Sequence, residues 1–343
     1  MKLFRCHHCG QTLYFENWRC ERCGHTLGYA HWLDEILLLD GDDWHLHNYR
    51  LCKNNKYAAC NWVIAPDDQH DYCRACRHNR TVPDLGDAGN LARWQEFEMA
   101  KRRLFYSLLH LNLPLPTTAE DPSGLAFDFL ADPTADDAPP VTTGHADGVI
   151  TINILEADDA ARESTRQSMG EAYRTVLGHF RHEVGHFYWQ HLIRSDADHE
   201  ACRVVFGDER EDYAEALQRH YENGPATNWQ DGFVSAYATA HPWEDFAETW
   251  AHYLHITDTL ETAYAFGISV DPQATADSTL EAAIDFNPYC QNSIEVLIER
   301  WLPLAFAVNS LNRSMGHADF YPFVLPPQAI KKLSFVHDLI RRQ

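Results

Sequence analysis

Apolar residues recur at helical spacing over much of the chain after residue 90. Between Asn90 and Leu111 they fall on one helical face, at Leu91, Trp94, Phe97, Leu104, Phe105, Leu108 and Leu109. Pro114 then ends this predicted helix. A longer helix is expected over Ala161–Leu192, and shorter ones over Arg210–Tyr221, Pro242–Ile256 and Ser293–Leu311. The second part of the chain is therefore predicted to be mostly helical.

Extended segments are expected in front of the long helix. Leu125–Leu130 and Gly148–Leu155 each hold a short apolar run, and β-branched residues dominate Val149–Ile154. Such residues pack well on a pleated sheet. We expect a small antiparallel sheet here, and an α+β fold for the chain as a whole.

Composition and charge exclude two kinds of partner. No run approaches the ~20 apolar residues of a membrane helix. The net charge is −22: residues 111–343 hold 14 Lys and Arg against 36 Asp and Glu, while residues 1–110 hold 14 basic and 14 acidic residues. Such an acidic surface repels phosphate backbones, so neither a membrane nor nucleic acid is expected as a partner. The N-terminus has no apolar signal region, which predicts a cytoplasmic protein.

Eight of the ten cysteines lie before residue 77, at spacings typical of zinc ligands. Two CxxC knuckles close a tetrahedral zinc site, because each offers two thiolates from a tight turn. The first predicted structural zinc site is a ribbon made by Cys6, Cys9, Cys20 and Cys23. Gly10 and Gly24 follow the two knuckles, where the turn needs a permissive backbone.

A second structural zinc site is expected from one further knuckle and two more widely spaced cysteines. Its predicted ligands are Cys52, Cys60, Cys73 and Cys76, with His70 left open as a replacement for one of them. Four protein ligands leave no position for substrate. Both sites should therefore be structural, or serve to bind a protein partner.

The run His182-Glu183-Val184-Gly185-His186 carries the catalytic hypothesis. Residues four apart lie on one face of a helix, so both imidazoles can reach the same zinc ion. Glu183 then lies beside the ion, where it can take a proton from a bound water. This pattern predicts a zinc-dependent hydrolase.

A third ligand is needed, since catalytic zinc takes three protein ligands and one water. The pattern HExxHxxGxxH is excluded, because Trp189 and Leu192 occupy its last two positions. Glu244 is the favoured ligand, since Pro242 starts a helix just before it and aromatic neighbours indicate burial. Asp245 and Glu248 are expected to orient the imidazoles. The alternatives left open are Glu248 itself, another Asp or His, and Glu209, Glu211 or Asp212.

These features together resemble a family of bacterial zinc-binding metallopeptidases. The resemblance rests on the ribbon, on HEVGH and on Glu-Asp-Phe-Ala-Glu-Thr-Trp-Ala-His-Tyr-Leu-His at 244–255. It implies a zinc-ribbon region over residues 1–80 joined to a gluzincin-like, zincin-type peptidase domain over residues 90–343. One catalytic and two structural Zn²⁺ ions are expected, with a peptide or protein as substrate.

A more distant resemblance concerns Tyr237. Peptidases similar to anthrax lethal factor carry a Glu-Phe-Phe-Ala-Glu run whose first Glu binds zinc, and a Tyr seven residues upstream faces the metal. Here the run is Glu-Asp-Phe-Ala-Glu from Glu244, and Tyr237 lies seven residues before it. The resemblance implies that Tyr237 donates a hydrogen bond to the oxyanion, with a packing role as the alternative.

Two other classes of function stay open. In the first, the chain is a zinc-ribbon scaffold that binds partners without turnover; in the second, it hydrolyses a non-peptide amide. The presence of Glu183 favours an enzyme, because a scaffold has no need of this base.

Overall fold

The computed structural model describes residues 1–40, 49–133, 139–163, 175–273 and 278–343. Within these residues the chain forms two compact units, Met1–Arg162 and Glu163–Gln343. The expected α+β fold, with zinc-ribbon modules and small antiparallel sheets, is confirmed. No helix among the described residues is long and apolar enough to cross a membrane.

The first unit begins with antiparallel two-stranded ribbons that surround an aromatic core. The strands are β1 (Phe4–Arg5) with β2 (Thr12–Leu13), β3 (Leu27–Ala30) with β4 (Glu35–Leu38), and β5 (Arg50–Leu51) with β6 (Val63–Ile64). Tyr29 makes edge-to-face contacts with Phe15 and Trp62 at centroid distances of 4.9 and 5.1 Å. Phe15 also packs on Tyr106 of helix α1 (Ala88–His110), so this core joins the ribbons to the helix.

A four-stranded sheet completes the first unit, in the order β7 (Asn79–Thr81), β8 (Ala126–Leu130), β10 (Val149–Asn153), β9 (Gly144–Ala146). The expected strands at 125–130 and 148–155 are present, but they pair with each other in parallel. Only β9 and β10 are antiparallel in this sheet, while β7 and β8 are also parallel. The reason is that β9 follows β8 in the sequence and runs in the opposite direction at the edge of the sheet, so that β10 then runs in the same direction as β8.

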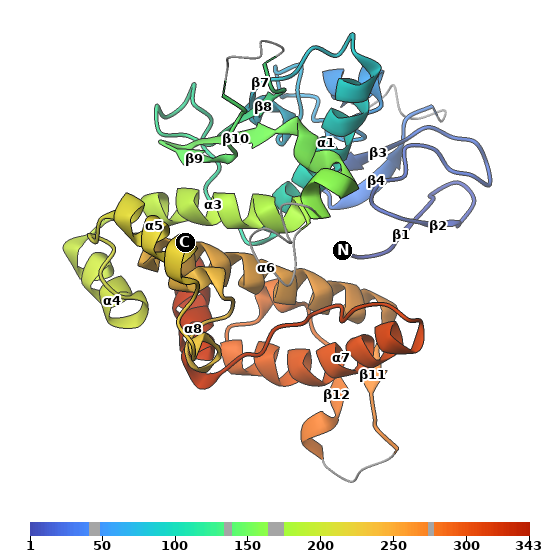
Figure 1. The fold of residues 1–343 in the computed structure, drawn as a ribbon. Coiled ribbons are helices and arrows are strands. Elements are labelled where there is room, and N and C mark those ends of the chain that lie inside the picture. Colours follow the sequence, from blue (N-terminus) through green and yellow to red (C-terminus); the bar gives the residue numbers. More distant parts are fainter. Residues whose placement is uncertain (41–48, 134–138, 164–174, 274–277) are drawn as a thin grey trace. The chain divides into compact units, whose positions relative to one another are not determined.

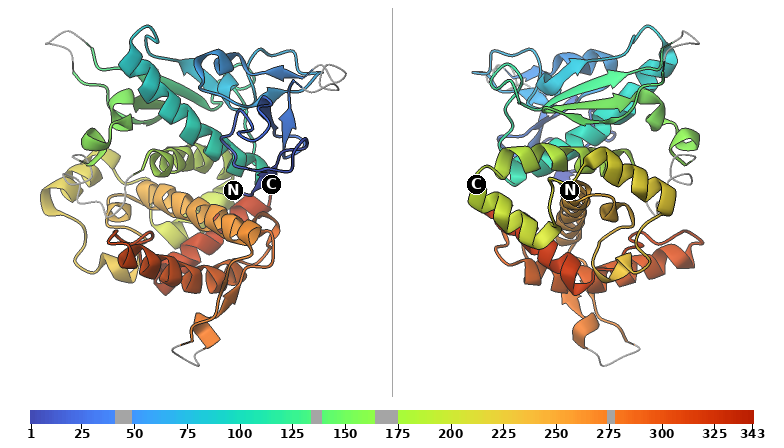
Figure 2. Two further views of the ribbon diagram at one scale, coloured as in Figure 1. Left: turned by 90° about the vertical axis from the view of Figure 1, so that its right-hand side faces the viewer. Right: turned by 60° about the vertical axis from the view of Figure 1, so that its left-hand side comes forward.

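The second unit is helical. It contains α3 (Val176–Leu192), α4 (Asp196–Phe206), α5 (Tyr213–Asn223), α6 (Pro242–Phe266), α7 (Ile294–Ser314) and α8 (Pro327–Arg341). Figure 1 shows α3 running beside α6, and α7 on the other side of α6. The small hairpin of β11 (Ser269–Val270) and β12 (Ala282–Ala283) projects from these helices (Figure 2).

A glycine sets the distance between α3 and α6. A Cβ atom at Gly185 would lie 2.9 Å from Ala247 Cα and 3.2 Å from Trp250 Cβ. Real side chains do not approach backbone so closely, so the two helices can be this near only without a side chain at position 185. The contact brings the HEVGH segment against the start of α6.

The structure refines several expected elements. The predicted Ala161–Leu192 helix is described only in part, because residues 164–174 lie outside the described residues. Pro242 opens α6 as expected, and the His241 side chain caps the helix by accepting from the Trp243 N–H. Helices α4 and α8 were not expected from the apolar pattern.

Candidate metal centre

Four cysteines meet at each of two places in the first unit. The clusters are Cys6, Cys9, Cys20 and Cys23, and Cys52, Cys60, Cys73 and Cys76. The Sγ–Sγ distances are 3.6 Å for Cys6–Cys23 and 3.7 Å for Cys60–Cys73. Two thiolates bound to one zinc ion at about 2.3 Å lie about 3.8 Å apart at the tetrahedral angle. Both clusters therefore fit a zinc ion.

The thiols of the first cluster lie among backbone donors. The N–H of Cys23 lowers the pKa of Cys20 to about 6 against the effect of burial, which favours the thiolate at this one position. The pKa of Cys23 is raised, because the lowering effect of the His25 N–H is outweighed by burial and the other thiols. His70, the alternative ligand, is elsewhere: its ring is exposed and its Nδ1 lies 2.7 Å from Asp68.

A different cluster forms where α3 meets α6 in the second unit. The ligand atoms of His182, His186 and Glu244 all lie within 4.8 Å of one another. Glu244 Oε2 is 2.9 Å from His182 Nε2 and 3.5 Å from His186 Nε2. All three residues are buried.

The arrangement of these atoms fits a zinc ion better than it fits hydrogen bonds. Glu244 Oε2 is fully buried, and within the described residues it has no hydrogen-bond partner. A buried carboxylate oxygen without such a partner is costly. Two imidazoles and one carboxylate are the donor set of a catalytic zinc site, with one position left open.

A chain of hydrogen bonds orients the His182 ring through its Nδ1 atom. Its Nδ1 lies 2.7 Å from Glu248 Oε1, one turn along α6 from Glu244. Ser235 Oγ donates to the other oxygen of Glu248 at 2.6 Å, and accepts from the Ala238 N–H. With Nδ1 donating to Glu248, Nε2 keeps its lone pair for a metal.

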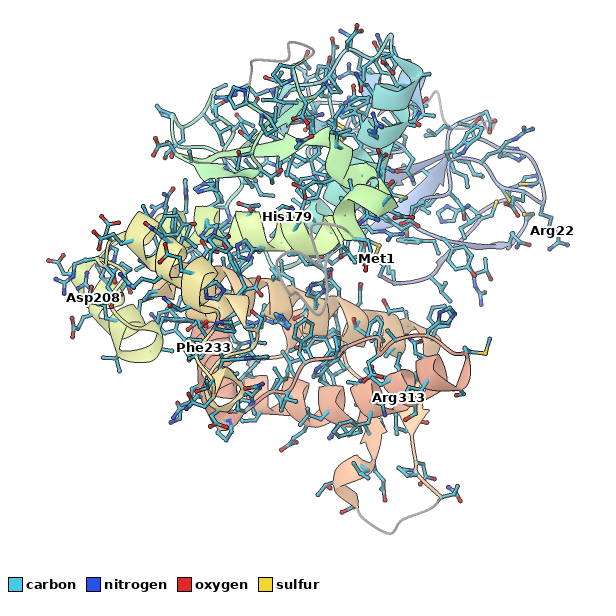
Figure 3. The ribbon with its side chains drawn as sticks, in the orientation of Figure 1. Met1, Arg22, His179, Asp208, Phe233 and Arg313 are labelled. Carbon is cyan, nitrogen blue, oxygen red and sulfur yellow. The ribbon has the colours of Figure 1, made fainter. Side chains whose placement is uncertain are left out.

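Glu183 is buried beside the two histidines and pairs with a residue one turn earlier on α3. His179 Nε2 lies 3.1 Å from Glu183 Oε1; Figure 3 labels His179 on this helix. Burial raises the pKa of Glu183, but His179 and the two neighbouring imidazoles lower it by more, and the resulting pKa lies below its ordinary value. Glu183 is thus a carboxylate at neutral pH.

Two tyrosines lie at the cluster. The Tyr237 ring is 5.9 Å from the His182 ring, and burial raises the pKa of its hydroxyl. Tyr213, from the start of α5, donates its hydroxyl to Glu244 Oε1 at 2.6 Å. The Trp243 ring packs against His186, with the two ring centroids 4.3 Å apart.

The remaining predicted residues lie away from the imidazoles. Asp245 faces α8, where its Oδ2 is 2.6 Å from Lys332 Nζ, so its contact is with a buried cation. Among the alternative ligands, Glu209 is bound by Arg203 at 2.6 and 3.0 Å. Asp212 accepts from the Glu215 N–H and caps α5.

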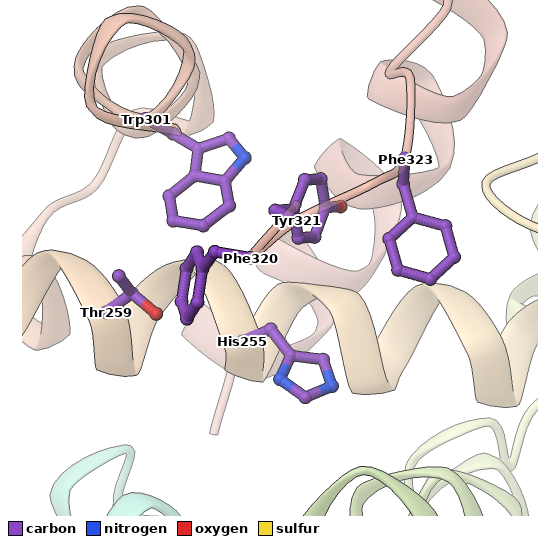
Figure 4. Close-up of a pocket in the computed structure, with 6 residues that line it drawn as sticks. All are labelled: His255, Thr259, Trp301, Phe320, Tyr321 and Phe323. Atoms are coloured by element: carbon purple, nitrogen blue, oxygen red, sulfur yellow. The ribbon is translucent and has the colours of Figure 1, made fainter. Parts of the chain in front are cut away.

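A separate cavity of about 20 Å³ lies between α6, α7 and the segment after α7. Figure 4 shows its lining, which includes none of the predicted ligands: His255, Thr259, Trp301, Phe320, Tyr321 and Phe323. A space of this size holds about one water molecule. It is too small to be a substrate pocket.

Sequence reasoning missed three polar contacts of the centre, those of His179, Ser235 and Tyr213. The contact of His179 could have been predicted from the sequence, because His179 lies four residues before Glu183 on the predicted helix. Ser235 and Tyr213 lie 13 and 31 residues from their partners. No periodic pattern links residues at such separations, so only the fold reveals these two.

Comparison with known proteins covers both regions. A family model described as "Putative zinc-binding metallo-peptidase" matches residues 90–339, and a zinc-ribbon domain model matches residues 3–87. Uncharacterized proteins of Mycobacterium bovis and of two Mycobacterium tuberculosis strains are each 43% identical to this chain over 342 residues, covering 99% of it and 95% of the relative. No solved structure matches the chain. The first model spans the His182–Glu244 cluster, and the second spans both cysteine clusters.

Proposed function

This chain belongs to the family of zinc-binding metallo-peptidases, and on that premise we propose that its second unit hydrolyses peptide bonds with one catalytic zinc ion. The observation that carries the proposal is the convergence of His182, His186 and Glu244, with Glu183 buried beside them. Two further zinc ions would occupy the four-cysteine clusters and stabilise the ribbons, giving three per chain.

The three ligands would hold the ion with one position open to solvent and substrate. When bound, zinc supplies Lewis acidity, which lowers the pKa of a water molecule and polarises the substrate carbonyl. Glu248 and Ser235 fix the orientation of the His182 ring. Such supporting contacts are worth about 10–100-fold in metal affinity or activity.

Glu183 would act as general base and then as general acid. Its carboxylate takes one proton from the attacking water as the water oxygen bonds to the carbonyl carbon. The same proton then passes to the leaving amine as the C–N bond breaks. His179 holds one oxygen of Glu183, which leaves the other oxygen for the water.

Tyr237 would donate a hydrogen bond to the oxyanion that develops on the carbonyl oxygen. Its place beside His182 supports this role, and its raised pKa keeps the hydroxyl protonated. Tyr237→Phe should therefore lower kcat without changing zinc content.

The test is cleavage of an unbiased peptide library by the zinc-loaded full chain and by Glu183→Gln. We expect Glu183→Gln to bind three zinc ions and to lose cleavage, while Glu299→Gln, an exposed control on α7, keeps it. Cleavage by Glu183→Gln at the wild-type rate would exclude Glu183 as the base. A wild-type chain that holds three zinc ions and cleaves no peptide would instead favour the scaffold or the non-peptide amide reading.

A further inference from the structure

Each oxygen of Glu244 has its own contact. Oε2 faces the two imidazoles, whereas Oε1 accepts the Tyr213 hydroxyl at 2.6 Å. Hydrogen bonds from a hydroxyl to a carboxylate of this length are strong. The Tyr213 hydroxyl therefore fixes the rotation of the carboxylate, with Oε2 turned toward the imidazoles and Oε1 turned away.

Tyr213 comes from a helix that has little else to hold it. Of the residues of α5, only Ala216 is buried, and Tyr213 itself is 37% exposed. A helix with so small a buried apolar area depends on a few specific contacts for its order.

Those contacts go to the segment that ends in Glu244. The Tyr213 ring lies 5.3 Å from the His241 ring and 5.7 Å from the Trp243 ring. His241 Nε2 is 3.2 Å from the Glu211 carbonyl, just before α5. Farther along α5, His220 Nδ1 is 3.4 Å from Thr239 Oγ1. Helix α5 is thus attached to the start of α6, with the metal ligand at the attachment point.

We propose that Tyr213 is a positioning residue for the ligand Glu244, and that through it the order of α5 is coupled to metal occupancy of the centre. Zinc held by Glu244 fixes the acceptor of the Tyr213 hydroxyl, which stabilises α5. By reciprocity, displacing α5 weakens zinc binding. The inference rests on the metal site of the proposed function, but not on peptide hydrolysis.

The test compares zinc affinity of the full chain and of Tyr213→Phe, by competition with a buffered chelator. The substitution keeps the ring that packs on His241 and Trp243 and removes only the hydroxyl. We expect the affinity of the non-cysteine site to fall about 10–100-fold. His186→Ala identifies that site by its loss, and Tyr264→Phe, an exposed tyrosine on α6, serves as the matched control.

Hydrogen exchange supplies the second readout. Adding zinc to the chelated wild type should slow amide exchange in α5, and the slowing should be smaller in Tyr213→Phe. Wild-type zinc affinity in Tyr213→Phe, or α5 exchange that does not respond to zinc, would overturn the coupling and leave the peptidase proposal standing. A wild-type chain with zinc only at its cysteine clusters would refute both.

Discussion

Replacing Lys332 by methionine removes the cation from a buried ion pair between α8 and α6. Lys332 Nζ lies 2.6 Å from Asp245 Oδ2 and donates to the Gly232 carbonyl at 2.8 Å. It also lies 3.8 Å from the centroid of the Phe233 ring. Asp245 is fully buried and Lys332 is 6% exposed, so water cannot replace the lost partner.

The expected cost follows from these contacts. Removing one partner of a buried pair costs about 3–5 kcal/mol. The lower end applies here, because burial already raises the pKa of Asp245 to about 7, and a stranded carboxylate can take up a proton. A loss of about 3 kcal/mol should lower the Tm of a unit of this size by about 6–12 °C.

Urea unfolding followed by tryptophan fluorescence measures this loss, and a double-mutant cycle with Asp245→Asn isolates the pair. The double variant should be more stable than the sum of the two single changes predicts, because it leaves no unpaired charge. A loss below about 1 kcal/mol for Lys332→Met, or strictly additive changes, would show that the pair does not hold α8 to α6.

Three further outcomes are expected. Gly185→Ala should destabilise the second unit by about 1–3 kcal/mol in the same assay, since its Cβ meets Ala247. Gly232→Ala should have little effect, because no described residue lies within 4 Å of the added Cβ. Burial lowers the pKa of His252 from 6.5 to about 4, against a smaller opposing effect of Glu248. Between about pH 4 and pH 6.5, His252 is therefore protonated in the unfolded chain and neutral in the folded one. The free energy of unfolding should fall on acidification through this range by up to about 1.4 kcal/mol per pH unit, and His252→Gln should make this slope shallower. Zinc removal by a strong chelator should unfold the ribbons and change the tryptophan fluorescence of the chain, to which the buried Trp62 contributes; unchanged fluorescence in the metal-free chain would refute a structural role for their zinc.

Local patterns were enough to predict several elements. The apolar spacing from Leu91 to Leu109 predicted α1 to within a few residues, although the second half of this helix, from Leu104 to Leu108, is buried on every side. The spacing of the two knuckles predicted which cysteines meet in the first cluster, and one knuckle with the more widely spaced Cys52 and Cys60 predicted the second. The family suggested by these motifs is confirmed.

Other features depend on contacts between distant segments. Helix α4 is largely exposed, with only Cys202 and Phe206 buried, so it has little apolar face to reveal it. The parallel pairing of β8 and β10 depends on the path of the chain between them, which no strand pattern records. Asp245 was expected to orient the imidazoles, but adjacent residues of a helix point about 100° apart, and Asp245 contacts Lys332, 87 positions along the sequence, instead.

The close approach of α3 and α6 at Gly185 also indicates how a metal centre of this kind can lose its ion during evolution. A side chain at this position must push α3 and α6 apart, which would move the Glu244 carboxylate away from both rings. At the proposed zinc centre, metal binding would then be lost through a residue that lies outside the ligand set. Relatives that keep both histidines and Glu244 but carry a bulky residue at position 185 are the ones in which to look for an inactive descendant.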